Sequence, residues 1–306
     1  MIPSRFPIAR YKLQFIVSET IFLPTYAGST LRGAFGQSLR RIACMTKLKD
    51  CKGCPLYYSC PYTQIFETPV PESHHLQKFS QVPNAYIIEP PSWGERTYQK
   101  GEVLSFELVL FGNLLEKLAL IIFVFQRAFE YRIAQGKAKL NAVYQQNNLL
   151  QWQDIWENQI LQPLDNEITI PDNLPTNMNI EVQTPLRIQE NGQPLREHNI
   201  KVERFLLTLA KRISLLNEFH QNSLNLNFSQ LKEEITEVKD IKFLEWRDWH
   251  RYSSRQKQKM ALGGVMGEWQ FSNLSENWQK LIYLGQWLHC GKNATFGLGK
   301  YKITNL

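Results

Sequence analysis

The chain has 306 residues, of which 43% are hydrophobic and 12% aromatic, and its formal net charge is +7. This length suits two modules of ordinary size, each with enough apolar residues for a core. The most apolar stretch, residues 118–125, is too short to span a membrane, which needs about 20 residues. Residues 1–10 contain prolines and no apolar run typical of a secretory signal. We therefore expect a cytoplasmic protein with no membrane partner. Positive charge and aromatic content together favour a polyanionic partner, although a basic protein without a nucleic-acid role has a similar composition.

The first half of the chain predicts a succession of strands and helices. Alternation of apolar and polar residues at 10–17 predicts a strand. A helix capped by Ser29 is expected next, because apolar residues recur at helical spacing, at Leu31, Phe35, Leu39 and Ile42. Gly33 and Gly36 weaken this helix by about 1 kcal/mol each relative to Ala, which close approach by another backbone would justify. The remaining predicted elements are a strand at 103–110, an apolar helix at 114–129 and a strand at 140–145.

A domain boundary is predicted at residues 162–177, where Pro163, Pro171 and Pro175 interrupt a polar stretch. The same order of elements then returns, with a strand at 180–188, a helix at 202–219, strands at 241–252 and 264–271, a helix at 274–288 and a strand at 296–303. Strand, helix, strand, strand, helix, strand is the order of a ferredoxin-like module. The sequence therefore predicts an α+β protein with two tandem ferredoxin-like (RRM-like, βαββαβ) modules, residues 1–165 and 178–306.

A glycine-rich loop near the C-terminus is the most informative segment. Residues 288–301 read LHCGKNATFGLGKY and place glycines around Lys292 and Lys300. Glycines let a backbone come close to a ligand, successive free N–H groups bind phosphate, and lysines add positive charge. An ordinary helix-to-strand loop is the alternative. Because residues 291–306 contain no acidic side chain, we interpret the loop at 291–299 as a contact for an RNA backbone.

Residues 241–259, IKFLEWRDWHRYSSRQKQK, mix basic residues with Trp246, Trp249 and Tyr252. Aromatic faces stack on bases and cations bind phosphates, so this mixture suits single-stranded RNA or RNA beside a hairpin. A solvated hairpin with its tryptophans in the core is the alternative. The stretch 29–49 is also basic and free of acidic residues, and here a plain basic helix face is the alternative. The residues predicted to bind RNA in these segments are Arg32, Arg40, Arg41, Arg247, Arg251, Arg255, Gly291, Lys292, Gly297, Gly299 and Lys300.

Four of the five cysteines form an inserted knuckle at residues 44–60. Cys44, Cys51, Cys54 and Cys60 have the spacing C-x6-C-x2-C-x5-C, whereas Cys290 stands apart. In a reducing cytoplasm such a cluster indicates a metal site before it indicates disulfides. Four thiolates suit tetrahedral zinc, and they suit an iron–sulfur cluster equally. We favour a structural zinc because nothing else in the sequence indicates redox chemistry, and free thiols are the remaining alternative.

Four segments together resemble one family. They are LRGAFGQSLRR at 31–41, the cysteine knuckle running into CPYTQIFE at 60–67, WRDWHRYSSRQ at 246–256 followed by GGVMGEW, and HCGKNATFGLGKY at 289–301. These segments are similar to the CRISPR-associated RAMP endoribonucleases that process pre-crRNA, in the branch that carries a cysteine cluster. The resemblance covers residues 10–303. It implies tandem ferredoxin-like folds and CRISPR repeat RNA as the partner, with subunits of a CRISPR interference complex as further candidate partners.

The resemblance also implies cleavage within each repeat without a catalytic metal or cofactor. In that reaction a 2′-OH attacks the adjacent phosphorus and leaves a 2′,3′-cyclic phosphate and a 5′-OH. It needs a general base, a general acid and cations near the oxyanion, roles that His, Tyr and Lys can fill. Many family members place a catalytic histidine shortly after the first helix, but this chain has no histidine between residues 1 and 73. The predicted catalytic residues are therefore His289, His250, Tyr26, Tyr252 and Lys47, and a place in the core is the alternative for the two histidines.

Two other functions share these features. A non-catalytic RAMP subunit that binds crRNA within an interference complex would have the same glycine-rich tail and basic surface. A zinc-stabilised RNA-binding protein outside CRISPR systems is a more distant alternative. The sequence contains no P-loop, no dinucleotide-binding fingerprint and no H-E-x-x-H motif, so a metabolic enzyme is not expected.

Overall fold

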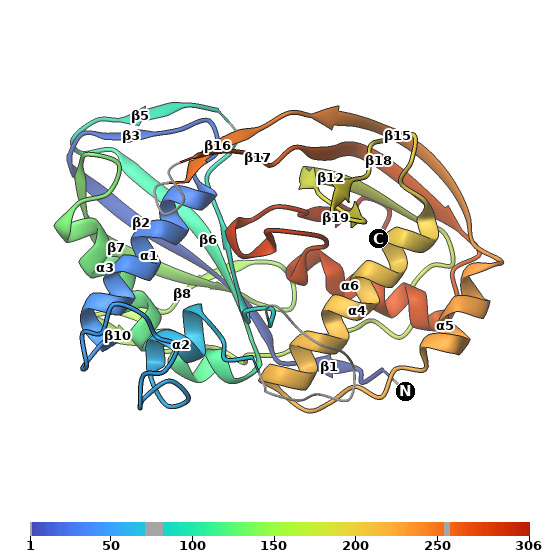
Figure 1. Ribbon diagram of the computed structural model, residues 1–306, viewed down its shortest axis with the longest axis horizontal. Coiled ribbons are helices and arrows are strands. Elements are labelled where there is room, and N and C mark those ends of the chain that lie inside the picture. The colour runs from blue at the N-terminus through green and yellow to red at the C-terminus, as the bar shows by residue number, and fades with distance from the viewer. Residues whose placement is uncertain (1, 71–81, 93, 254–257) are drawn as a thin grey trace. The chain divides into compact units, whose positions relative to one another are not determined.

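The computed structural model describes residues 2–70, 82–92, 94–253 and 258–306 (Figure 1). These residues form two compact units. The N-terminal unit contains residues 7–167 and 219–221, and the C-terminal unit contains residues 1–6, 168–218 and 222–306. Each unit has its own sheet and its own core, and each is described by itself.

The N-terminal unit contains a five-stranded antiparallel sheet in the order β4-β6-β2-β7-β8. Its elements are β2 (Ile8–Glu19), β3 (Ile21–Leu23), α1 (Gly28–Ala43), α2 (Pro61–Phe66), β4 (Tyr86–Glu89), β5 (Arg96–Tyr98), β6 (Val103–Phe111), the 3-10 helix η1 (Gly112–Lys117), α3 (Leu118–Tyr131), β7 (Lys137–Gln146), β8 (Trp152–Asp154), β9 (Trp156–Glu157) and β10 (Ile160–Leu161). Apart from the edge strand β8, the sheet contains the four strands of a βαββαβ module, which in chain order are β2, β4, β6 and β7. Across the sheet they lie in the order second, third, first, fourth. This is the ferredoxin-like arrangement predicted from the order of elements.

Helices α1 and α3 pack beside each other against this sheet (Figure 1). Aromatic side chains form the contact, because the Phe35 and Phe125 rings stack with their centroids 4.8 Å apart. Phe125 also approaches the Phe106 ring of β6, at 4.9 Å. The sequence suggested that another backbone approaches Gly36 closely, but the close neighbour is a side chain. A Cβ at Gly36 would lie 2.3 Å from the Phe66 ring. Gly33 has open space around it, so packing does not explain that glycine.

The C-terminal unit repeats the arrangement with a four-stranded antiparallel sheet in the order β15-β18-β12-β19. Its elements are β1 (Arg5–Phe6), β11 (Ile168–Thr169), β12 (Met178–Leu186), β13 (Gln189–Glu190), β14 (Gln193–Pro194), α4 (Val202–His220, whose last two residues belong to the other unit), α5 (Phe228–Ile235), β15 (Lys239–Arg247), β16 (His250–Ser253), β17 (Gln258–Ala261), β18 (Gly264–Ser272), α6 (Glu276–Leu288), the 3-10 helix η2 (Ala294–Phe296) and β19 (Tyr301–Ile303). Phe205 of α4 packs on the Trp269 ring of β18, at 5.0 Å. Tandem ferredoxin-like modules are therefore confirmed.

Several predicted element boundaries need correction. Helix α1 begins at Gly28 after Ala27, without a side-chain cap, so Ser29 lies in the first turn rather than at the N-cap. The strand predicted at 241–252 is two strands, because β15 ends where Arg247 pairs with Gly264, and β16 then pairs with β17 in a separate two-stranded sheet. The strand predicted at 296–303 is short, since β19 begins at Tyr301. The helix predicted at 114–129 begins as the 3-10 helix η1.

None of the helices in the described parts of the chain is long and apolar enough to cross a membrane. Helix α3, the most apolar by sequence, instead buries most of its apolar residues within the N-terminal unit, with Phe123 as an exposed exception. Ile121, Ile122, Val124, Phe125 and Phe129 are each at most 1% exposed. This burial accounts for the apolar stretch that the sequence shows at 118–125.

Candidate nucleic-acid interface

The glycine-rich loop runs from the end of α6 to β19 and is held against the end of β12. Three hydrogen bonds make this contact: the Lys292 N–H donates to the Arg187 carbonyl (2.8 Å), the Gly299 N–H donates to the Pro185 carbonyl (3.1 Å) and the Thr184 hydroxyl donates to the Gly297 carbonyl (2.7 Å). Where the loop begins, the Arg212 guanidinium donates through Nε to the carbonyl of Leu288, at 2.7 Å. The loop is thus fixed to the fold at its start, middle and end.

The glycines of this loop are required by close backbone packing, both within the loop and against the residue that follows β12. Gly299 has φ +71°, and a Cβ there would lie 1.8 Å from the Cys290 carbonyl oxygen. Gly291 has φ +86°, and its Cβ would lie 2.5 Å from the Arg187 carbonyl oxygen. Both Gly297 and Gly299 are buried, whereas Lys292 is exposed. Burial gives Gly297 and Gly299 a packing role, while their contact with RNA stays a prediction, and the accessible part of the loop centres on residues 291–293.

His289, predicted as a catalytic residue, lies in the core of the C-terminal unit. Its side chain is 0% exposed, and its Nδ1 lies 3.1 Å from the Leu298 carbonyl oxygen. The neighbouring Cys290 is also fully buried, and this burial raises the pKa of its thiol to about 12. The placement supports the core alternative for His289, because a general base must reach the proton that it abstracts.

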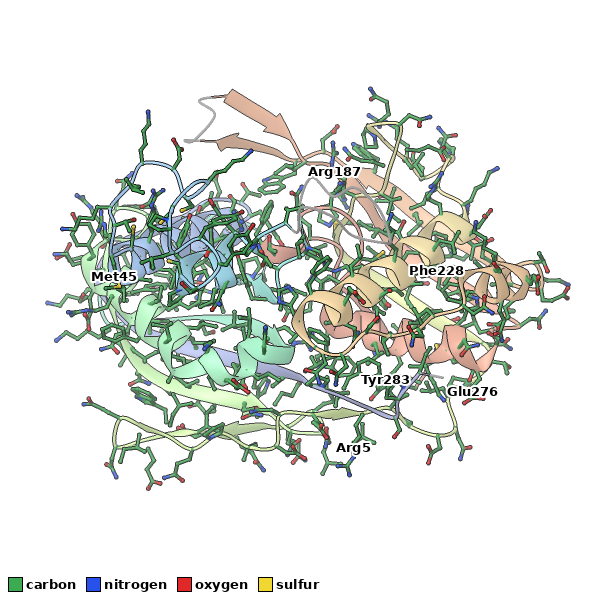
Figure 2. All side chains as sticks on the ribbon, turned by 60° about the horizontal axis from the view of Figure 1, so that its bottom comes forward. Arg5, Met45, Arg187, Phe228, Glu276 and Tyr283 are labelled. Atoms are coloured by element: carbon green, nitrogen blue, oxygen red, sulfur yellow. The ribbon has the colours of Figure 1, made fainter. Side chains whose placement is uncertain are left out.

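A basic patch adjoins the accessible part of the loop. Arg187, marked in Figure 2, donates through Nη1 to the Gly263 carbonyl at 2.8 Å. A Cβ at Gly263 would lie 2.7 Å from the Trp246 ring, so that ring packs on this glycine. The Arg196 guanidinium lies 4.6 Å from the Trp246 ring centroid. We define the basic patch as the connected set Arg187, Arg196, Trp246, Arg247 and Lys292.

The basic patch combines residues that sequence reasoning found and residues that it missed. Arg247 and Lys292 were predicted to bind RNA, and both are exposed. Arg187 and Arg196 were missed, because they lie between the motifs in sequence and only tertiary contacts bring them to Trp246 and Gly263. Burial lowers the pKa of the Arg187 guanidinium, but its ordinary value is so high that the side chain stays positively charged at neutral pH.

The predicted residues of the hairpin β16–β17 are described in part. His250, Arg251 and Tyr252 belong to β16, and their backbones pair with Ala261, Met260 and Lys259 of β17. Their side chains lie outside the part of the chain that the structure describes, and so does all of Arg255. Their roles in RNA binding and catalysis stay predictions.

Of the three arginines of α1 in the N-terminal unit, only Arg41 is exposed. The Arg32 guanidinium lies 4.2 Å from the Phe66 ring centroid, and Arg40 donates through Nη2 to the carbonyls of Leu48 and Lys49, each at 2.6 Å. Arg40 therefore holds the start of the cysteine knuckle. Arg41 is the member of this group whose position best suits contact with a phosphate.

Tyr26, a second predicted catalytic residue, is only 3% exposed. Its burial, and secondarily the negative charge of Glu89, raise the pKa of its phenol well above the ordinary value. Glu89 itself is buried and pairs with Arg10 at 3.0 Å. A phenol held in the core in this way is poorly placed to exchange a proton with RNA. Lys47, by contrast, is exposed and adopts a positive φ of 53° within the knuckle.

The four knuckle cysteines line one small cavity, Cys44, Cys51, Cys54 and Cys60 all contributing to its wall. The Thr46 hydroxyl lies 3.5 Å from the Cys54 sulfur. Desolvation acts to raise the pKa of the Cys44 thiol, but the Lys47 N–H, the Thr46 hydroxyl and the Arg40 guanidinium lower it below its ordinary value overall. Among the described residues, no three His, Cys, Asp or Glu side chains are grouped as metal ligands. The cavity thus gathers four thiols, and metal binding stays a prediction.

We expect protein purified without a chelator to contain zinc at about one equivalent, held by these four thiolates. Elemental analysis measures it. The Cys54→Ser variant should lose the metal, because one of four ligands is removed, whereas Cys290→Ala should keep it, because Cys290 belongs to the other unit. Iron in place of zinc would indicate a cluster, and protein free of both metals would contradict a metal site.

Two family models match the chain, one in each half. The AF_1859_N model, described as an N-terminal domain, matches residues 6–168. The model of CRISPR-associated endoribonuclease Cas6 matches residues 180–301, which include the basic patch and the glycine-rich loop. Residues 180–301 of the chain belong to the Cas6 family. Its resemblance to the CRISPR-associated RAMP endoribonucleases is thereby confirmed, while its place in a cysteine-cluster branch stays a prediction.

The similar proteins cover almost the whole chain. An uncharacterized protein of Archaeoglobus fulgidus is 21% identical over 294 residues, which are 92% of this chain and 92% of the relative. The solved Thermus thermophilus Cas6 covers 99% of this chain and 100% of its own, with a TM-score of 0.52 and 12% identity. A chain of a partial Cas6-RT-Cas1–Cas2 complex matches 97% of this chain with a TM-score of 0.59 and 12% identity, and this chain spans only 46% of it. At these identities the structures establish a shared fold.

Proposed function

We propose that this protein is a pre-crRNA processing endoribonuclease that binds CRISPR repeat RNA and cuts it within each repeat. The observation that carries the proposal is the basic patch, which lies within the residues matched by the Cas6 model. The Arg196 guanidinium lies over the Trp246 ring, and Arg187 donates to Gly263, on which that ring packs. The Lys292 N–H in turn donates to the Arg187 carbonyl, which places Lys292 beside this group in the accessible part of the glycine-rich loop. Such a set suits RNA, because the cations bind phosphates without regard to sequence and the ring stacks on a base.

Replacing Lys292 with Ala is expected to weaken binding of repeat RNA and to flatten its dependence on salt. Each phosphate contact that a cation makes releases a counterion, so the slope of log K against log[salt] should fall by about 0.7 for single-stranded RNA. Fluorescence anisotropy at several salt concentrations measures this slope. Lys302→Ala is the matched control, because Lys302 is exposed in the same unit but already paired with Glu181 at 2.7 Å. An unchanged slope for Lys292→Ala would make the loop an ordinary structural connection.

The cleavage that we propose uses the 2′-OH of the RNA as nucleophile and no catalytic metal. Because His289 and Tyr26 are buried, the scheme assigns proton transfer to His250 and Tyr252. Placing the 2′-OH in line with the leaving oxygen supplies a further part of the rate enhancement. The same burial also favours the second candidate, a non-catalytic crRNA-binding subunit of an interference complex.

Incubation with end-labelled repeat RNA separates the two candidates. Over short times in EDTA, the endoribonuclease should produce fragments with 2′,3′-cyclic phosphate and 5′-OH ends, because the chemistry needs no metal-bound water. Mapping of the product ends identifies them. RNA that is bound but stays intact under all conditions would favour the non-catalytic subunit instead.

A further inference from the structure

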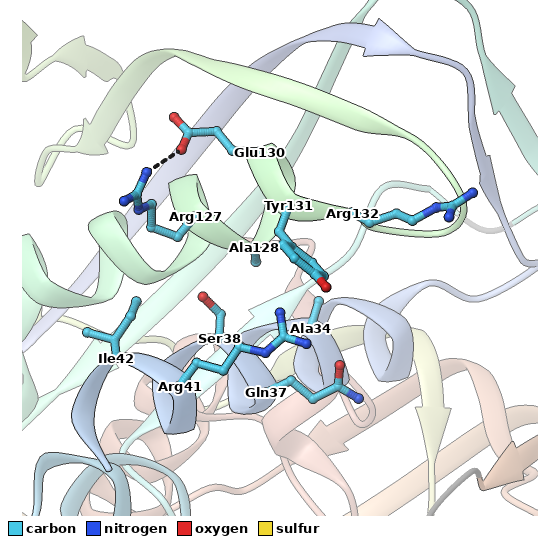
Figure 3. A pocket seen from close by; sticks show the side chains of 10 residues that line it. All are labelled: Ala34, Gln37, Ser38, Arg41, Ile42, Arg127, Ala128, Glu130, Tyr131 and Arg132. Atoms are coloured by element: carbon cyan, nitrogen blue, oxygen red, sulfur yellow. Dashed lines mark hydrogen bonds and ion pairs between the residues drawn. The ribbon is translucent and has the colours of Figure 1, made fainter. Parts of the chain in front are cut away.

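A groove lies between α1 and α3 on the helical side of the N-terminal unit (Figure 3). Its volume is about 420 Å³, within the range of sites that take small molecules or single nucleotides. Small side chains keep its floor open, namely Ala34 and Ser38 from α1 and Ala128 from α3. The Ser38 hydroxyl donates to the Val124 carbonyl at 2.9 Å, so its own polar group is satisfied within the fold. The groove is therefore a built feature of the helix packing.

The rim of this groove is aromatic and basic. Tyr131 is 66% exposed, and the Arg41 guanidinium lies 4.2 Å from its ring centroid. Figure 3 shows the two side chains beside each other. Arg127 and Glu130 pair at 3.1 Å and largely neutralise each other. Among the described residues, no carboxylate pairs with Arg41 or with Arg132, whose Nε donates to the Gln135 carbonyl at 3.2 Å. The rim thus carries two uncompensated positive charges beside an exposed ring.

We infer that this groove binds a single-stranded segment of RNA. One base stacks on the Tyr131 face that Arg41 leaves uncovered, and Arg41 and Arg132 contact the adjoining phosphates. The charges favour RNA over a protein partner. Two guanidinium groups without a carboxylate partner, beside an exposed aromatic ring, are complementary to a base and its flanking phosphates. The inference rests on the proposed function for the source of the RNA, which would be a part of the pre-crRNA other than that held by the basic patch.

Cross-linking tests this groove directly. An octauridine that contains 4-thiouridine is irradiated with the full-length protein, and the cross-linked peptides are identified by mass spectrometry. The wild type should give cross-links in residues 127–132. Tyr131→Ala should lower their yield about 5- to 150-fold at subsaturating RNA, the loss expected when one base–aromatic stack is removed. Arg41→Gln should lower the yield as well, and the yield at the peptide that contains Lys292 should stay unchanged.

Phe22→Ala is the matched control, because Phe22 is an aromatic side chain of the same unit that is 51% exposed and lies outside the groove. Equal losses for Phe22→Ala and Tyr131→Ala, or a wild-type protein without cross-links at 127–132, would overturn the inference. Cleavage of repeat RNA is measured with the same preparations. Cleavage without cross-links in the groove refutes the groove alone, and cross-links there without any cleavage refute the proposed nuclease activity alone.

Discussion

A repeat RNA with a 2′-deoxy substitution at the nucleotide 5′ to the cut is expected to bind normally and to resist cleavage. The substitution removes the proposed nucleophile, so the rate at that bond should fall below detection. Binding should be nearly unchanged, because cations and aromatic rings contact phosphates and bases. Single-turnover cleavage and anisotropy measure the two effects on one labelled RNA. Cutting of the 2′-deoxy RNA at the same bond would show that water, rather than the 2′-OH, is the nucleophile.

The same assay tests the assignment of proton transfer. His250→Ala should slow single-turnover cleavage by about 10²–10⁴-fold, the range that a general acid or base contributes. His198→Ala is the control, since the His198 side chain is 85% exposed and is assigned no role. If the 2′-deoxy RNA is spared but His250→Ala cleaves at the wild-type rate, the mechanism stands and the assignment to His250 fails.

The Gly299→Ala substitution is expected to destabilise the protein more than other Gly→Ala changes. A residue with a side chain at positive φ costs about 1–2 kcal/mol. At Gly299 the added Cβ would also lie 1.8 Å from the Cys290 carbonyl oxygen, so the loop backbone must shift. We expect a loss of about 3 kcal/mol in the free energy of unfolding, which lowers Tm by roughly 6–12 °C for a unit of this size. Thermal unfolding followed by circular dichroism measures it.

Comparison with Gly192→Ala separates the cost of a positive φ angle from the cost of steric overlap with the added Cβ. Gly192 has φ +80° in the same unit, but no atom lies within 4 Å of its added Cβ. Its substitution should therefore cost only the conformational part, about 1–2 kcal/mol. Equal Tm changes for the two variants would mean that the loop backbone relaxes around the methyl group, and that Gly299 is required by its φ angle alone.

The order of elements and the family could be predicted from the sequence, because both depend on local patterns. Residues 103–111, 118–131 and 202–220 form a strand and helices where the period of their apolar residues predicted them. The spacing of apolar residues depends on which face of the helix or strand meets the core. It can therefore be recognised without knowing which residues pack against that face. The motifs at 31–41, 60–67, 246–256 and 289–301 together likewise indicated the family without any knowledge of their contacts. Predictions were weaker at the ends of elements: Ser29 is no cap, and β15 ends at Arg247.

Only the tertiary structure decided which chemical groups are accessible. The sequence offered His289 and Tyr26 as catalysts and Gly297 and Gly299 as backbone contacts, but all four lie buried. Burial depends on what packs against a residue from distant segments, and no local pattern reports that. The same reason explains the missed arginines, because Arg187 and Arg196 join the site only through Gly263 and Trp246. The sequence thus determined the fold and the family, and long-range packing determined which of the basic and catalytic candidates are accessible.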